Sequence, residues 1–176
     1  MSGSEKKGLV MLKYAMSYGV ILGSFWVFKY IFLIGTGISD HFLYIYNLLA
    51  VGTLLMYYVL LRRYRDNGLG GKINYLQCIS FSVLLFLFSA LIEAVIIYIH
   101  YRFIDPKYIM TRNPGWLEMA MRWTFSREWV DELKNNYGNV MVVISEIIKN
   151  IIIGFFLSLV YGIFVTRNSN KKQADK

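Results

Sequence analysis

Long runs of hydrophobic residues, separated by shorter polar stretches, dominate the pattern along the chain. Four such runs lie near residues 14–34, 42–61, 76–101 and 140–165. Each approaches the roughly 20 apolar residues that an α-helix needs to cross a hydrocarbon core of ~30 Å. The pattern therefore predicts an all-α membrane protein, a four-transmembrane-helix bundle that forms a single domain over residues 1–166.

The segment between the third and fourth runs, residues 102–138, is too long for a simple connector. Asn113 and Ser126 are candidate caps for two short stretches with apolar residues at helical spacing. Amphipathic helices that contain tryptophan lie comfortably on a membrane surface. We therefore expect an amphipathic helical outer loop, with a lid over the bundle as the alternative. The polar segment 167–176 predicts a disordered tail.

Basic residues are distributed unevenly among the loops. They are in excess in the N-terminal segment, in the loop after the second run and in the C-terminal segment, whereas acidic residues balance them in the other loops. By the positive-inside rule, this asymmetry predicts a multi-pass protein with both termini in the cytoplasm. Membrane topology thus explains the formal charge of +8, so the expected partner is the lipid bilayer and not nucleic acid.

The turn after the second run, RRYRDNGLGGKINYLQ, is rich in arginine and glycine. Gly68 is a candidate for ending the preceding helix in the left-handed conformation, and Gly70 and Gly71 allow a tight reversal. We expect the arginines to lie beside anionic lipid headgroups. The glycine spacing is not that of a phosphate-binding P-loop, so we interpret the turn as a charged hairpin.

A polar stripe follows one side of the third run. Its members are separated by seven, four and seven positions, which places them on one narrow face of a helix: Ser82, Ser89, Glu93 and His100. A carboxylate that faced lipid would be costly. We therefore expect this stripe to face protein or a wet cavity.

Small residues form two candidate helix-packing surfaces. In the fourth run a ridge with four-residue spacing starts with polar residues and continues with small ones: Glu146, Asn150, Gly154, Ser158 and Gly162. The first run carries Gly19 and Gly23. Because small residues let two helix backbones approach closely, we interpret both surfaces as helix contacts.

Some ionisable residues fall in the outer half of the bilayer when depth is estimated from the helical rise of ~1.5 Å per residue. They are Lys29, Glu93, Glu146 and Lys149. Their formal charges cancel, which predicts a buried charge cluster in which Lys29 or Lys149 faces Glu93. Alternatively, Glu146 and Lys149 pair along their own helix, and Lys29 reaches the interface. We favour structural pairing over a ligand or transport role.

The chain contains no HExxH, GxSxG or Walker A pattern, so we predict no catalytic residues and no cofactor. His41 and His100 both fall near the predicted outer surface, which leaves open a metal or proton-relay site. Histidines on different helices without a spaced motif favour hydrogen bonding at the interface instead. We therefore predict no metal site.

Three segments resemble a known family: YRDNGLGGKINYLQCISFSVLLFLFSALI at 64–92, IYIHYRFIDP at 97–106 and SEIIKNIIIGFFLSLVYGIFV at 145–165. On these segments the chain resembles the four-transmembrane-helix domain-of-unknown-function 4199 family of Bacteroidetes inner-membrane proteins. By that resemblance Glu146, Gly154 and Ser158 match positions that the family usually fills alike. The resemblance implies a bacterial inner-membrane location and supplies no activity.

These features together favour an integral membrane protein without enzymatic activity. We expect it to act through helix–helix association, as an accessory or scaffolding subunit bound to another membrane protein or to a second copy. The alternative is a small oligomeric transporter or channel that uses Glu93 and Glu146 for ion or proton passage. Four spans are few for a substrate cavity within one chain, so this alternative requires an oligomer.

Overall fold

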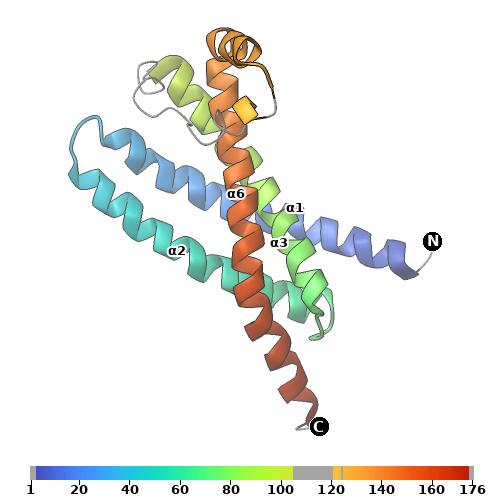
Figure 1. Cartoon of the computed structure of the whole chain (residues 1–176). Coiled ribbons are helices and arrows are strands. Elements are labelled where there is room, and N and C mark those ends of the chain that lie inside the picture. The colour runs from blue at the N-terminus through green and yellow to red at the C-terminus, as the bar shows by residue number, and fades with distance from the viewer. Residues whose placement is uncertain (1–2, 105–120, 124, 175–176) are drawn as a thin grey trace.

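Long helices dominate the structure, a computed structural model that describes residues 3–104, 121–123 and 125–174 and has no strand among them (Figure 1). The main helices are α1 (Gly3–Gly35), α2 (His41–Arg63), α3 (Tyr75–Ile99) and α6 (Arg127–Ala174). Together with the short helical turns that continue α2 and α3, they form four stretches that are long and apolar enough to cross a membrane: Lys7–Gly35, His41–Gly68, Tyr75–Ile104 and Val140–Thr166. The predicted all-α class with four membrane-spanning helices is therefore confirmed.

Three of the apolar helices extend well past the predicted spans. Helix α1 begins at Gly3, and short π-helical turns, η1 (Tyr64–Gly68) and η2 (His100–Ile104), continue α2 and α3. No proline interrupts these extensions, and polar residues continue a helix once it leaves the hydrocarbon. Hydropathy marks only the membrane-embedded part of a helix. The predicted spans are therefore shorter than the helices that contain them.

Helix α6 is continuous from Arg127 to Ala174, where we predicted a short surface helix, a separate span and a disordered tail. Ser126 caps its start, because its hydroxyl accepts a hydrogen bond from the backbone N–H of Trp129 at 3.4 Å. The stretch before the apolar span, residues 127–139, contains no proline, and its one glycine, Gly138, costs a helix only about 1 kcal/mol. Nothing therefore breaks the helix before the membrane. The remainder of the predicted outer loop, including Asn113, lies outside the described residues.

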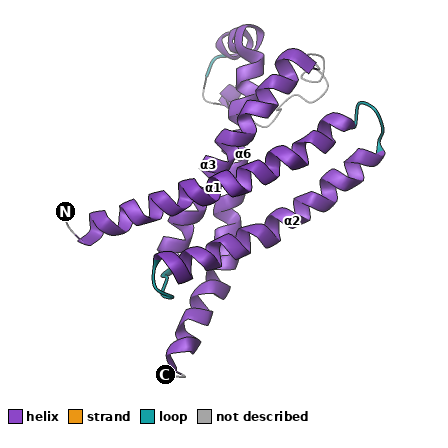
Figure 2. Cartoon of the chain, turned by 180° about the vertical axis from the view of Figure 1, so that it is seen from behind, coloured by secondary structure: helices purple, strands orange, loops and turns teal. Residues whose placement is uncertain are grey.

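Helix α3 occupies the centre of the bundle. It packs along α1 on one side and along α6 on the other, while α2 contacts the rest of the chain mainly through α1. The α1–α2 hairpin crosses the α3–α6 pair in both views of the chain (Figures 1 and 2). Polar residues on α3 can therefore meet partners from two neighbouring helices.

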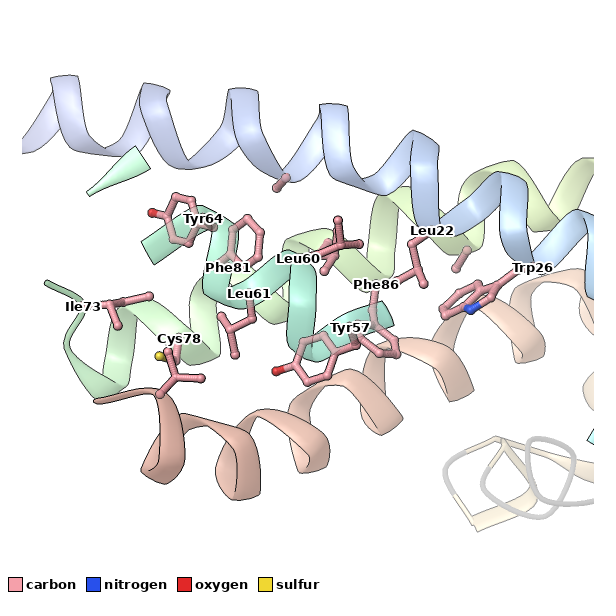
Figure 3. Packing of buried hydrophobic residues seen from close by; sticks show 14 residues of the cluster. Leu22, Trp26, Tyr57, Leu60, Leu61, Tyr64, Ile73, Cys78, Phe81 and Phe86 are labelled. Carbon is pink, nitrogen blue, oxygen red and sulfur yellow. The ribbon is translucent and has the colours of Figure 1, made fainter. Parts of the chain in front are cut away.

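Aromatic side chains fill the largest buried cluster (Figure 3). The ring of Tyr64 stacks on Phe81 with centroids 4.0 Å apart and planes 7° from parallel. The ring of Tyr57 meets Phe86 edge-on at 5.3 Å. Lipid tails are as apolar as these rings, so close packing, and not exclusion from water, stabilises this core.

The turn between α2 and α3 reverses the chain as its glycines predict. Gly70 and Gly71 have φ values of 64° and 90°, which only glycine adopts easily. Gly68 has no such conformation, so the prediction that it ends the helix in the left-handed region is wrong. A Cβ atom there would lie 2.9 Å from the ring of Tyr64, and close packing explains this glycine instead.

Candidate functional site: a buried charge cluster

Glu93 joins three helices at the centre of the bundle. Its Oε1 atom lies 4.0 Å from the Nζ atom of Lys29 on α1. Its Oε2 atom accepts a hydrogen bond of 2.9 Å from the side-chain amide of Asn150 on α6. The residue is only 5% exposed, so the carboxylate is satisfied by protein on both sides.

Lys29 also contacts the fourth helix, α2. Its Nζ atom lies 5.6 Å from the ring centroid of Trp26 and 5.1 Å from that of Tyr46 on α2. Aromatic faces attract cations, most strongly where water is excluded. The side chain is 12% exposed, so Lys29 is held within the bundle and does not extend to the interface.

Glu146 and Lys149 form an ion pair with each other, three positions apart on α6. Their side chains are 29% and 44% exposed, in contrast to 12% for Lys29 and 7% for Glu93. The group predicted as one cluster thus divides into a buried pair between helices and a partly exposed pair on one helix. Of the two lysines considered, Lys29 is the one that faces Glu93.

The polar stripe on α3 faces inward, since all four of its residues are buried: Ser82, Ser89, Glu93 and His100. The hydroxyl groups of Ser82 and Tyr57 lie 2.7 Å apart. Ser89 donates to the carbonyl oxygen of Gly19 on α1 at 3.3 Å. The Nδ1 atom of His100 lies 2.9 Å from the hydroxyl of Tyr30. The stripe therefore links α3 to α1 and α2 at several depths.

Both small-residue surfaces pack against α3 within the chain. A Cβ atom added at Gly19 or Gly23 would lie 2.6 or 2.9 Å from the Cβ atoms of Phe88 and Ile92. On α6, a Cβ atom at Gly154 would lie 2.5 Å from the ring of Phe86. Two further members of the α6 ridge are buried in the same contact: Ser158 and Gly162. These glycines allow the close approach that lets Asn150 and Lys29 reach Glu93.

The burial of Arg65 was not predicted from the sequence. It is 2% exposed, and its guanidinium contacts Asp66 at 2.8 Å and donates to the carbonyl of Val165 on α6 at 3.3 Å. The expectation that it lies beside lipid headgroups is wrong. Leu61, four positions earlier and fully buried, indicates the reason, because residues at this spacing share a helix face.

The histidines lie in different environments. His100 is buried against Tyr30, whereas His41 is exposed at the first residue of α2. In the part of the chain that the structure describes, no group of three or more His, Cys, Asp or Glu residues is placed to hold a metal ion. The buried indole Nε1 atom of Trp26, beside Lys29, has no hydrogen-bond partner among those residues.

The geometry of the cluster supports two kinds of chemistry. A buried ion pair with an amide partner fixes the relative positions of helices, because each partner is costly to bury alone. A carboxylate inside a membrane can also take up and release a proton or cation.

Comparison with known proteins adds a family. No curated protein and no solved structure matches the chain. One family model, described as "Protein of unknown function (DUF4199)", matches residues 17–167. The match covers most of the chain, including residues 17–35 of the first apolar stretch, all of the other three and every residue of the charge cluster. The chain therefore belongs to this family of unknown function.

Proposed function

We propose that the protein is a non-enzymatic accessory or scaffolding subunit that associates with other membrane helices. The observation that supports this most directly is the separation of polar and apolar side chains in its membrane-spanning helices. The charged and hydrogen-bonding groups of the spans are turned mainly inward, and the outward faces of α2 and α6 are broad and apolar. On α6 the exposed side chains include Phe155, Phe156, Val160, Ile163 and Phe164.

The association surface we propose differs from the one expected from sequence. The small-residue ridges are occupied by α3 within the chain, so they are not free for a partner. The outer faces of α2 and α6 are the surfaces that remain. Helix α2 contacts the chain mainly through α1, so much of its circumference is open to lipid or to another helix.

We further propose that the protein resides in the bacterial inner membrane with both termini in the cytoplasm. The charge asymmetry of its loops supports this orientation. Arg62, Arg63 and Lys72 are exposed at the α2–α3 turn, on the side of the bundle where both termini also lie. This arrangement suits the anionic cytoplasmic leaflet.

The test is purification of the tagged full chain from native membranes, followed by identification of proteins that co-purify with it. Phe156→Ala and Leu55→Ala alter the two outer faces, and Phe28→Ala is the matched control on α1, where Phe28 is also exposed. We expect a membrane protein that is lost with one of the first two variants and retained with the control. Recovery of the chain alone, or a partner insensitive to both faces, would overturn the proposal.

The second candidate is a small oligomeric transporter or channel. It is favoured by one observation, the carboxylate of Glu93 opposite Lys29 within the membrane-spanning helices. Taking up a proton or cation would weaken the attraction to Lys29 and so couple binding to helix packing. Liposome flux of protons and alkali cations tests it, with Glu93→Gln and Glu146→Gln as variants. Flux that is absent, or that is unchanged in both variants, would exclude this candidate.

A further inference from the structure

Two hydrogen-bond donors beside Glu93 have no acceptor in the part of the chain that the structure describes. The indole Nε1 atom of Trp26, a residue only 2% exposed, has no hydrogen-bond partner there. The ammonium of Lys29 lies 4.0 Å from the Oε1 atom of Glu93, which is beyond hydrogen-bonding distance, and it donates to no other described atom. Burying a donor without an acceptor is unfavourable, most of all for a charged group, so both donors require one.

The two donors belong to the same site. Trp26 and Lys29 are three positions apart on α1, a spacing that places them on one face of the helix. The Nζ atom of Lys29 lies 5.6 Å from the centroid of the Trp26 ring. This ring projects from α1 into the bundle, where it meets Phe86 of α3 edge-on at 5.4 Å (Figure 3). A small molecule between Lys29 and Glu93 therefore lies close to the indole as well.

The charges around the site select the class of molecule that fits it. An anion accepts hydrogen bonds from an ammonium and an indole, but the carboxylate of Glu93 would repel it. A cation would be repelled by Lys29 and would leave both donors unmet. A neutral molecule that both accepts and donates suits all three groups, because Lys29 and Trp26 are donors and Oε1 of Glu93 is an acceptor. Asn150 donates to the other carboxylate oxygen, Oε2.

We infer that a buried water molecule bridges Lys29 and Glu93 and accepts a hydrogen bond from the indole N–H of Trp26. The water accepts from both donors and donates to Oε1, and about three hydrogen bonds are usual for a water inside a protein. A separation above 3.5 Å between two polar groups is commonly closed in this way. The side chains of Lys29 and Glu93 are 12% and 7% exposed, so the water is held inside the bundle.

Water at this position adds a proton partner to the charge cluster. A carboxylate exchanges protons with a group that it reaches directly or through one water. Proton passage at Glu93, the second candidate function, requires such a partner, whereas the accessory role does not. Hydration and function can therefore fail separately. A hydrated site without flux leaves the accessory role in place, and a dry site overturns the water bridge while co-purification still decides whether the chain binds a partner.

Solid-state NMR of the full chain in lipid bilayers tests for this water. Magnetisation that starts on water is expected to reach the indole N–H of Trp26, identified as the one of the four tryptophan signals that Trp26→Phe removes. Should that variant not fold, sequential assignment through residue 26 identifies the signal instead. Trp129, which is 43% exposed, is the positive control, and the backbone N–H of the fully buried Leu85 is the negative control. No transfer to Trp26, or equal transfer to Leu85, would overturn the inference.

An experimental structure at a resolution that shows ordered water locates the molecule directly. It also excludes magnetisation that reaches Trp26 only through the exchangeable ammonium protons of Lys29. We expect density for one water at hydrogen-bonding distance from both the Nζ atom of Lys29 and the Oε1 atom of Glu93. A direct contact of ~2.8 Å between those two atoms, the usual length of such a pair, would overturn the bridge. Density for an ion at the same place would overturn the assignment to water.

Discussion

The carboxylate of Glu93 on α3 lies 4.0 Å from the ammonium of Lys29 on α1, and Asn150 on α6 donates to the same carboxylate. This contact connects three helices at a depth where water is scarce. Removing one charge of such a pair leaves the other buried and unbalanced, whereas removing both leaves only a packing defect. The stabilising effect of each charge should therefore depend on the presence of the other.

Single replacement of either charge is expected to destabilise the bundle strongly. Lys29→Met and Glu93→Gln should each lower the free energy of unfolding by about 3–5 kcal/mol, because each leaves an uncompensated buried partner. The double variant should lose clearly less than the sum of the two. Unfolding in mixed detergent micelles, followed by helical circular dichroism, measures all three.

The pair on α6 provides the control for this experiment. Glu146 and Lys149 are both partly exposed, and exposed ion pairs contribute about 0–1 kcal/mol. Glu146→Gln should therefore change stability little. Equal losses for Glu146→Gln and Glu93→Gln would show that burial of Glu93 does not govern its contribution.

Gly154 on α6 is expected to tolerate no larger residue. A Cβ atom there would lie 2.5 Å from the Cγ atom of Phe86 and 2.8 Å from its Cβ atom, so α3 and α6 would have to separate. Gly154→Ala should cost about 1–3 kcal/mol, the usual effect of overpacking. Gly138→Ala is the matched control in the same helix, because nothing lies within 4 Å of its added Cβ atom, and it should stabilise by about 0.5–1 kcal/mol. The same unfolding measurement compares them, and equal changes at both positions would show that crowding against Phe86 does not govern the effect at Gly154.

Arg65 should require its guanidinium and not merely a positive charge. It contacts Asp66 and the carbonyl of Val165 at once, a geometry that the single ammonium of lysine cannot reproduce. Arg65→Lys is expected to lower the free energy of unfolding by about 1–3 kcal/mol, since buried acceptors lose their donor. Arg63→Lys, two positions earlier and exposed, should stay within about 0.5 kcal/mol of the parent protein. Similar effects at both positions would mean that α6 does not depend on this contact.

The sequence predicted those features that depend on one helix at a time. Helical periodicity alone brings Ser82, Ser89, Glu93 and His100 to one face, and the cost of a bare carboxylate in lipid turns that face inward. All four residues are indeed buried. Membrane-spanning helices follow from hydropathy for the same reason, because each run is judged against the bilayer and not against its neighbours.

Features that depend on how the helices are arranged around the bundle could not be predicted from the sequence. Lys29 and Lys149 were equally good partners for Glu93, because depth along each helix was known but rotation about its axis was not. The rotation of α6, which turns Asn150 and not Lys149 toward Glu93, decides in favour of Lys29. Arg65 shows the same limit, since charge counting cannot distinguish an arginine that faces headgroups from one that reaches the carbonyl of Val165.

The orientation of the chain in the membrane can be tested with two exposed loop positions. Ile38, in the turn between α1 and α2, is 87% exposed, and Lys72, in the turn between α2 and α3, is also exposed. In protein carrying Cys78→Ala, we expect an impermeant maleimide to label Ile38→Cys fully in intact spheroplasts. It should label Lys72→Cys only after permeabilisation, because the positive-inside rule predicts that the basic α2–α3 turn faces the cytoplasm. The opposite pattern would reverse the topology, and labelling of both positions in intact spheroplasts would show that α2 does not cross the bilayer.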